Sequence, residues 1–406
     1  MAPEAPGRLD RDNAALNWHH LAMPPRLACR QGLPLAPVLT LCAALAACSG
    51  APTPAVKPAT VTAPAAAVTP AAPAAPTAPV AAASPGAPGA PIHPLRASVA
   101  ALGGTLDVEI RDLPRAAAEA AIQAAVTEAG EMERMTDPGR ADGELAALNA
   151  AAGKGPRHVD PRLYAALARA LNYCLWSEGK EGPLGGDLHR LWGRDSGMPL
   201  SAPPSSEQLN RAVAAADCQR LTLNGREQTV TLAAGSALDL VDFSTGMAVD
   251  RAIEVLRQHG SANAFVQIRA VRRGIGPGRD GRGWMIDIPM MGGLREPLGR
   301  IFLRDQSLAI ATIDDHPLIV AGQPRHHFIN QQTGQPAEDG IFAILAVTEL
   351  ATDAQALAAT MTITGSQEGE MLTGSIRPRP SLLWLMGTGT GVPLLVEYRW
   401  TEVPKR

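Results

Sequence analysis

The sequence has few aromatic side chains and no large surplus of charge of either sign. Phe, Trp and Tyr together make up 3% of its 406 residues, which is thin for a platform on which nucleic-acid bases stack. Its formal net charge at pH 7 is −3, whereas binding to phosphate groups needs a surplus of Lys and Arg on one face. Both shortages argue against nucleic acid as a partner.

Cysteine is also scarce, and its spacing matches no paired zinc motif. The five cysteines are Cys29, Cys42, Cys48, Cys174 and Cys218, and no two of them form a Cys-x-x-Cys pair. If the chain is processed at Cys48, only Cys174 and Cys218 remain. These two residues could pair in an oxidising compartment, but the sequence alone leaves them either paired or free.

Residues 23–48 have the order of an export signal. Arg26 and Arg30 come first, and an apolar stretch over 33–47 follows them. That stretch is too short, and too interrupted by proline, to predict a membrane span. It ends in Leu-Ala-Ala-Cys48, which resembles the bacterial lipobox, where the Cys thiol takes a diacylglycerol and becomes the new N-terminus.

The alternative is an ordinary signal peptide cleaved after a small-residue site. We favour lipidation at Cys48, because cysteine stands at the required position and a linker follows at once. Translation could begin at Met1 or at Met23, since residues 1–22 are unusually charged for the front of such a signal. The expected location is the bacterial cell envelope, with the protein lipid-anchored to the membrane and facing the periplasm.

Residues 49–95 are almost entirely Ala, Pro, Thr and Val. Frequent proline blocks helix and favours extended polyproline geometry, and the segment lacks the apolar periodicity that a packed core needs. We therefore predict three parts: an export signal over 1–48, a disordered tether over 49–95 and a globular domain over 96–406.

The globular part interleaves predicted helices and strands. Helices are expected over 115–135, 161–179, 205–217, 247–260 and 353–364. Strands are expected over 105–110 and 342–349, and a hairpin over 220–232. Residues 263–271 and 283–290 are expected to pair across the turn between them. This mixture predicts an α+β or α/β domain.

The segment GPGRDG (276–281) formally fits the Gly-x-Gly-x-x-Gly pattern of dinucleotide-binding loops. No helix is predicted after it, and Pro277 stands where a phosphate-binding amide would be needed. We interpret it as a hairpin loop.

Four stretches carry motifs in a fixed order. DGELAALN (142–149) is similar to Asp-Ser-Glu-Leu-x-x-Leu-Asn, and GPLGGDLHRLWG (182–193) stands where Phe-Asp-Pro-Thr and then Leu-Trp-Gly would be expected. LDLVDFSTGMAVD (238–250) is similar to Leu-Asp-Leu-Gly-Gly-Ile-Ala-Lys-Gly-Tyr-Ala-Val-Asp. HHFINQQTGQP (326–336) is similar to Ser-His-Ile-Ile-Asp-Pro-x-Thr-Gly-x-Pro. In these motifs and their order the chain resembles the FAD:protein FMN transferases, the ApbE family.

The resemblance implies an α+β fold with antiparallel sheets flanked by helices. It implies a transferase that moves FMN from FAD to a threonine hydroxyl of an exported or membrane redox protein, forms a phosphoester, releases AMP and uses Mg²⁺. Such a reaction needs a cation on the diphosphate, a group that accepts the hydroxyl proton and a pocket for the isoalloxazine ring.

The resemblance also implies roles for particular residues. His327 matches the family histidine and would accept the proton, since the reference pKa of histidine suits that task. His326 is expected to be a solvated strand residue. The residues implied to bind the flavin nucleotide are Pro183, Ser244, Thr245, Gly246, Met247, Asp250, Thr333 and Gly334.

The chain departs from the family pattern at several of these motifs. Thr245 replaces the usual lysine, and Gly182 replaces the aspartate before Pro183. Arg269 and Ala270 fill two glycine positions, where larger side chains are expected to crowd any close approach to the backbone.

The metal ligands implied by the family are also altered. The family helix carries Asp and, four residues later, Thr; here Gln355 and Ala359 take those positions. Neither replaces a charged or hydroxyl ligand, because Mg²⁺ prefers hard, charged oxygens. Asp353 is a candidate substitute, but it lies about 10 Å along the helix from Thr360, too far for both to bind one ion. The ligand set is therefore left unknown.

A second hypothesis is a non-catalytic relative that keeps the fold and binds flavin, a partner or neither, as a lipoprotein with a degenerate metal site. It rests on Gln355, Ala359, Thr245 and Arg269. Neither the acceptor protein nor the oligomeric state follows from the sequence.

Overall fold

The computed structural model describes residues 93–291, 297–313, 316–338, 340–388 and 393–403. The expected export signal, Cys48 and the tether up to residue 92 lie outside the described residues. Within the described ranges, no helix is both long and apolar enough to cross a membrane.

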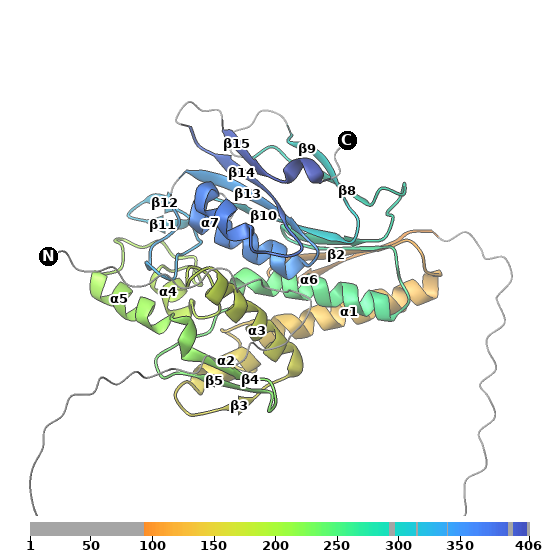
Figure 1. Ribbon diagram of the computed structural model, residues 1–406. Helices are drawn as coiled ribbons and strands as arrows, with labels where there is room; N and C mark the ends of the chain where they lie inside the picture. Colours follow the sequence, from red (N-terminus) through yellow and green to blue (C-terminus); the bar gives the residue numbers. More distant parts are fainter. Residues whose placement is uncertain (1–92, 292–296, 314–315, 339, 389–392, 404–406) are drawn as a thin grey trace, which may run out of the picture. The chain divides into compact units, whose positions relative to one another are not determined.

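An eight-stranded antiparallel sheet forms the centre of the fold (Figure 1). Its strands lie side by side in the order β1-β2-β6-β7-β10-β13-β14-β15. They are β1 Leu95–Ala101, β2 Gly104–Ile110, β6 Ala264–Ile268, β7 Val271–Ile275, β10 Gln306–Thr312, β13 Ile341–Thr348, β14 Ser381–Met386 and β15 Leu394–Tyr398. In β2 the buried residues alternate, as expected for a strand with one face on the core.

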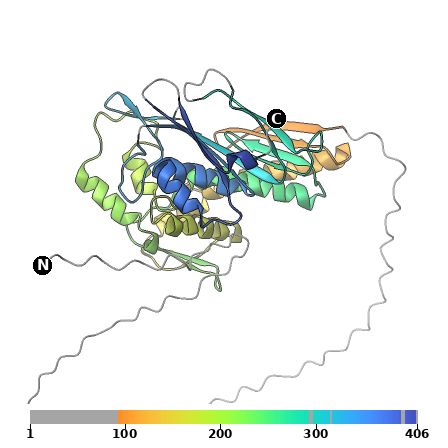
Figure 2. The same cartoon turned by 45° about the horizontal axis from the view of Figure 1, so that its top comes forward.

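Three helices cover one face of this sheet, as Figures 1 and 2 show. They are α1 Arg115–Thr136, α6 Val241–Gln258 and α7 Ala351–Thr373, and α6 contacts both of the others. Half of the buried residues of α1 are alanines, which have short side chains and suit close packing against α6. On the other face, the hairpin of β8 Trp284–Ile288 and β9 Gly299–Leu303 closes a second apolar cluster.

A further layer lies beyond α1 and α6 (Figure 1). It holds α2 Glu144–Ala150, α3 Pro161–Trp176, α4 Gly186–Leu191, α5 Ser206–Ala215, β3 Arg157–His158, β4 Leu221–Asn224 and β5 Thr229–Leu232. The small hairpin of β11 Leu318–Val320 and β12 Gln323–Arg325 and two 3-10 turns, Cys218–Arg220 and Trp400–Glu402, complete the described elements. The α+β class with an antiparallel sheet flanked by helices is confirmed.

Local sequence signals predicted several helices correctly. The Asp160 carboxylate accepts a hydrogen bond from Arg162 N at 2.8 Å and caps α3. Ser205 and Gln208, three residues apart, form a reciprocal capping box at the start of α5. The predicted helix over 353–364 lies within α7, which kinks at Gly365, where φ is 74°.

The predicted start of α6 at residue 247 was wrong, because the helix begins at Val241. The segment VDFSTG holds β-branched residues and glycine, which have low intrinsic helix propensity. Hydrogen bonds from outside the helix hold these early turns: Val241 N donates to the carboxylate of Asp239, two residues earlier, at 2.9 Å, and Gly246 N donates to Gln355 Oε1 of α7 at 2.7 Å.

The predicted pairing of 263–271 with 283–290 was also wrong. β6 pairs with β7 across the tight turn at Arg269 and Ala270, and β8 pairs with β9. The loop over 276–283 therefore connects two different sheets, not the two strands of one hairpin.

Candidate functional site

A cavity of 460 Å³ opens where the start of α6, the end of α1 and the segments around Arg269 and His327 meet. Apolar side chains from β7 and β10 form part of its wall. The charged and polar side chains in the wall include Arg194, Asp195, Asp239, Asp242, Arg269 and His327. The cavity therefore offers both cationic and anionic groups to a ligand.

His327 lies in the wall of this cavity. Its Nδ1 is buried and has no hydrogen-bond partner among the described residues, and its ring lies 4.1 Å from that of Phe328, centroid to centroid. Burial, reinforced by the nearby guanidinium of Arg194, holds the pKa of His327 well below its usual value. The imidazole is thus neutral at pH 7 and keeps a basic nitrogen.

The neighbouring His326 is not the solvated strand residue that we expected. Its side chain is 1% exposed, and its Nε2 lies 2.9 Å from the carbonyl oxygen of Ile341. This contact ties the segment before His327 to the start of β13. His326 therefore positions its neighbour and is shielded from solvent.

Arg194 is a largely buried cation near His327, with its side chain 10% exposed. Its guanidinium donates two parallel hydrogen bonds, each 2.6 Å long, to the Asp242 carboxylate and lies 5.7 Å from the centre of the Phe328 ring. This fork geometry is the strong form of an Arg–carboxylate pair. It connects the loop after α4 with the first turn of α6.

The wall residues Asp195 and Asp239 form a compact cluster with the buried His189. One ligand atom each from His189, Asp195 and Asp239 lies within 4.8 Å of the other two. However, His189 Nδ1 lies 2.6 Å from Asp239, and Arg194 Nη1 lies 3.2 Å from His189 Nε2. Both ring nitrogens are therefore engaged, and the guanidinium would repel a cation. We interpret the cluster as a hydrogen-bonded network.

The two aspartates of this cluster differ electrostatically. Burial favours a higher pKa for Asp239, but the ring of His189 and the cation of Arg194 hold that pKa below its usual value. Burial and the Asp239 charge raise the pKa of Asp195. The buried anion of the pair is thus Asp239.

The expected flavin-binding residues of α6 divide into two groups. Ser244 and Thr245 lie in the cavity wall, whereas Gly246, Met247 and Asp250 are not among the described wall residues. Met247 is 6% exposed and packs in the core.

Gly246 marks a helix crossing. A Cβ atom added there would lie 2.5 Å from the carbonyl oxygen of Ala351. The Asp250 carboxylate accepts hydrogen bonds from the backbone nitrogens of Ala351 and Thr352, both at 2.9 Å. Asp250 thus caps α7 from α6.

The remaining expected flavin-binding residues lie outside the described wall of this cavity. Gly334 has a φ of +72° and packs so closely on α5 that an added Cβ would lie 2.9 Å from Val213. Thr333 is exposed in the same turn. The Pro183 carbonyl accepts a hydrogen bond from Asp239 N at 2.9 Å, so it supports a cavity residue from behind.

The side chains at the altered metal-ligand positions of α7 do not provide a free carboxylate to the cavity. Gln355 lies in the cavity wall, where its Nε2 donates to the carbonyl of Val241 at 3.0 Å. Ala359 is 1% exposed and carries no donor atom. Asp353, the candidate substitute ligand, forms an ion pair with Arg169 and lines a different cavity. The structure therefore removes Asp353 from the metal position.

Arg269 and Ala270, which fill the two expected glycine positions, both lie in the cavity wall. Arg269 keeps the left-handed backbone of a glycine position, with φ at +52°. Its stem packs over Gly104, where an added Cβ would lie 2.6 Å from Arg269 Cγ. Arg269 therefore adds a positive charge at a position where the family pattern has a glycine.

Arg194 and its hydrogen-bonded partners Asp242 and His189 were not predicted from the sequence. The residue follows the Leu-Trp-Gly motif directly, but arginine after a turn is usually solvated, and nothing local reveals a carboxylate on a distant helix. Asp242 replaces a family glycine, and that unexplained charge was the available signal for a buried partner.

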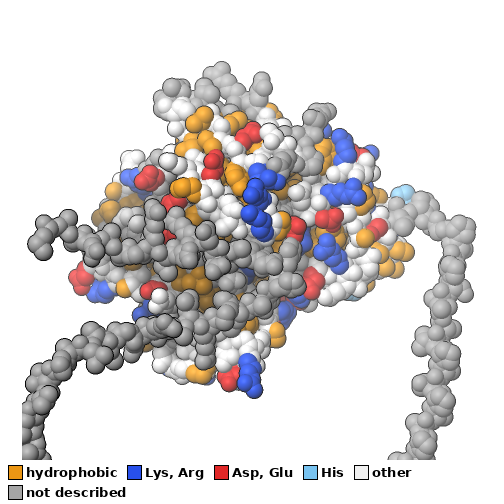
Figure 3. Space-filling view, in the orientation of Figure 1, with side chains coloured by type: hydrophobic (Ala, Val, Ile, Leu, Met, Phe, Trp, Pro, Cys, Tyr) orange, Lys and Arg blue, Asp and Glu red, His pale blue; other side chains and the backbone are white. Residues whose placement is uncertain are grey.

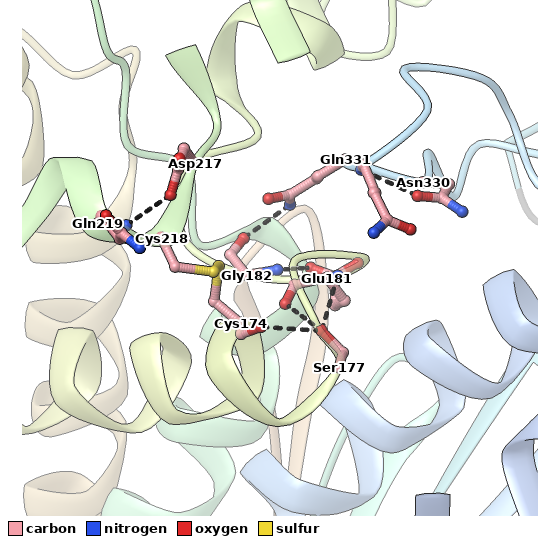
Figure 4. The surroundings of a disulfide bond; sticks show 10 residues. Cys174, Ser177, Glu181, Gly182, Asp217, Cys218, Gln219, Asn330 and Gln331 are labelled. Atoms are coloured by element: carbon pink, nitrogen blue, oxygen red, sulfur yellow. Dashed lines mark hydrogen bonds between the residues drawn. A yellow bond between two sulfur atoms is a disulfide. The ribbon is translucent and has the colours of Figure 1, made fainter. Parts of the chain in front are cut away.

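Cys174 and Cys218 form a disulfide, which settles the alternative left open above (Figure 4). It joins α3 to the 3-10 turn after α5. Figure 4 shows Gly182 beside it, where an added Cβ would lie 2.5 Å from Cys174 Cβ. Gln331 Nε2 donates to Gly182 O at 2.8 Å. The crosslink therefore supports the loop that connects to the His327 segment and to Asp239.

Charged side chains of both signs are mixed over the face in Figure 3. Among the described residues visible there, basic and acidic groups stand beside one another.

Comparisons with known proteins agree on one family. Residues 102–380 match the ApbE family. An FAD:protein FMN transferase from Treponema pallidum is 30% identical over 272 residues, which cover 63% of this chain and 74% of that protein. A crystal structure of an ApbE protein from Thermotoga maritima shares the fold, with a TM-score of 0.67 at 20% identity over 77% of this chain and all of that one. The apo flavinyl transferase ApbE of Pseudomonas stutzeri gives the same TM-score and identity, covering 77% of this chain and 97% of that one.

Proposed function

The chain belongs to the ApbE family, and we propose that it transfers FMN from FAD to a threonine hydroxyl of an exported redox protein. The relatives that carry this activity in their names support the proposal. The observation that carries it for this chain is the neutral His327 imidazole in the wall of the charged cavity.

His327 would act as the general base. The threonine oxygen forms a bond to the phosphorus of the FMN moiety while the bond from that phosphorus to the bridging oxygen breaks. The hydroxyl proton passes to the imidazole, and AMP leaves with the bridging oxygen. A base that is neutral at the working pH and half-buried suits this transfer.

Other cavity residues would bind and orient the nucleotide. Ser244 and Thr245 contribute hydroxyl groups to the cavity wall at the start of α6, and Arg269 also lies in that wall. Arg194, fixed by Asp242, supplies positive potential close to His327. These groups favour phosphate oxygens near the base.

Magnesium, the metal that the family resemblance implies, fits the side chains poorly. Gln355 is hydrogen-bonded to backbone groups through both its amide atoms, and Ala359 has no ligand atom. No step of the proposed reaction is therefore assigned to a metal here.

The same proposal includes a place in the cell. Lipidation at Cys48 and the tether over 49–95 would hold the domain near a membrane, facing the periplasm, within reach of a redox protein there. Labelling of expressing cells with a radioactive fatty acid, comparing the wild type with Cys48→Ala, tests this part. Equal labelling of both proteins would refute it.

The transfer itself is tested with the full chain, FAD and a panel of exported redox proteins. Flavin fluorescence in a denaturing gel detects covalent transfer, mass spectrometry locates the modified threonine, and chromatography measures AMP. The matched control is His327→Gln. Equal amounts of AMP and flavinylated protein support the proposal.

One outcome would favour the non-catalytic hypothesis instead. FAD that binds to wild type and His327→Gln equally, with no AMP and no labelled acceptor in the panel, indicates a flavin-binding lipoprotein. FAD that does not bind at all would refute both flavin hypotheses.

A further inference from the structure

The crossing of α6 and α7 is closed by one side-chain amide. Gln355 Oε1 accepts a hydrogen bond from Gly246 N at 2.7 Å, and Gln355 Nε2 donates one to Val241 O at 3.0 Å. Both partners are backbone groups of the early turns of α6. Gln355 Oε1 is thus already engaged in a hydrogen bond. The Val241 carbonyl at the cavity faces the N–H group of the amide and not its oxygen.

No other described side chain of α7 supplies a cation ligand to the cavity. Ala359 has no ligand atom, and the Thr360 hydroxyl is fully buried and donates to the carbonyl of Ala356 at 2.7 Å. The Asp353 carboxylate binds Arg169 and lines the second cavity. A divalent cation prefers several hard, charged oxygens, and this helix offers it none.

The amide can do in part what a cation would do. Its N–H donates a hydrogen bond to the Val241 carbonyl, and its oxygen accepts one from the Gly246 amide. The turn around Ser244 is therefore held in place without an ion. We infer that this chain binds its flavin nucleotide independently of divalent cations, with Gln355 in the role of a positioning residue. The inference rests on the proposed FAD-binding function.

An isosteric substitution tests the role of the amide. Gln355→Glu keeps the shape and the oxygen that accepts from Gly246, but it puts a second carboxylate oxygen against the Val241 carbonyl. Two oxygens at that distance repel each other unless a cation or a proton lies between them. Adding Ala359→Thr supplies a hydroxyl one turn further along the same helix. The pair should create a requirement for a cation that the wild type lacks.

The experiment is a titration of the full chain with FAD, followed by flavin fluorescence, in EDTA and in millimolar MgCl₂. We expect the wild-type affinities to agree within about twofold, since no ligand set on α7 links the two equilibria. The double variant Gln355→Glu/Ala359→Thr should bind FAD at least tenfold more tightly in MgCl₂ than in EDTA. Ala359→Thr alone is the matched control and should behave like the wild type.

The outcomes separate this inference from the function on which it rests. Wild-type affinity that falls tenfold or more in EDTA overturns the inference but leaves FAD binding intact. If Asp195→Asn then abolishes that dependence, the cation sits at the cluster of His189, Asp195 and Asp239, and the inference is wrong. FAD that binds under neither condition overturns the inference together with the proposed function.

A second readout does not depend on nucleotide. The melting temperature of the double variant should rise with MgCl₂, whereas that of the wild type should stay constant. A double variant that is as stable as the wild type in EDTA and indifferent to MgCl₂ would show that the amide has no positioning role.

Discussion

Removal of the disulfide should destabilise the domain strongly. Cys174 and Cys218 are 44 residues apart, and closing a loop of that length restricts the unfolded chain by about 4 kcal/mol in the chain-entropy model. Cys174 is fully buried against the Glu181–Pro183 loop, so the variant Cys174→Ala/Cys218→Ala also leaves unfilled space in the native state. We expect the free energy of unfolding to fall by about 3–5 kcal/mol.

Urea denaturation, followed by tryptophan fluorescence and circular dichroism, measures this difference. The control is dithiothreitol, which should bring the wild type close to the variant and leave the variant unchanged. A loss below about 1 kcal/mol would refute the reasoning, because it would mean that the unfolded chain gains little freedom when the crosslink is absent.

Three further predictions concern the cavity and the helix crossing. The rate of flavin transfer should stay constant from pH 7 upward and fall only below the usual histidine pKa of 6.5. The reason is that the lowered pKa of His327 keeps the imidazole unprotonated at mild acidity. A pH–rate profile that begins to decline above pH 7 would contradict this prediction. Arg194→Met should lower the free energy of unfolding, measured by urea denaturation, by about 3–5 kcal/mol, because it leaves the Asp242 carboxylate buried without its cation. Adding Asp242→Asn to the same chain should restore part of this loss. If it restores none, the ion pair does not contribute as described. Gly246→Ala should lower the stability of the domain by about 1–3 kcal/mol, because the added methyl group clashes with the backbone of α7. The control Gly130→Ala, exposed on α1 with open space around it, should raise stability by about 0.5–1 kcal/mol. Equal effects of the two substitutions in thermal denaturation would contradict the close helix crossing.

The elements that the sequence predicted correctly depend on local interactions. Asp160 caps α3 and Ser205 caps α5 with partners two or three residues away, so a short window of sequence contains the whole interaction. His327, which matches the family motif, lies in the cavity wall, and its role stays a prediction. The family resemblance, not the residue pattern, indicated which histidine to follow.

The wrong predictions depend on distant partners. Alternation in 284–288 identifies a strand, but a period of two does not say which strand pairs with it. The early turns of α6 have poor local propensity, and Gln355 of α7 holds them through Gly246 N and Val241 O. His326 looked solvated because its burial comes from β13, which follows it in the chain. The Arg194–Asp242 pair joins two segments that no local pattern relates.

The α6–α7 crossing, finally, has a consequence for motion. α6 caps the start of α7 through Asp250, and α7 reaches back to the early turns of α6 through Gln355. Neither helix can fray at the cavity without releasing hydrogen bonds of the other. The backbone amides of Gly246, Ala351 and Thr352 should therefore exchange with solvent hydrogen through one shared opening event. A nucleotide that touches only α6 would slow the exchange of α7 as well.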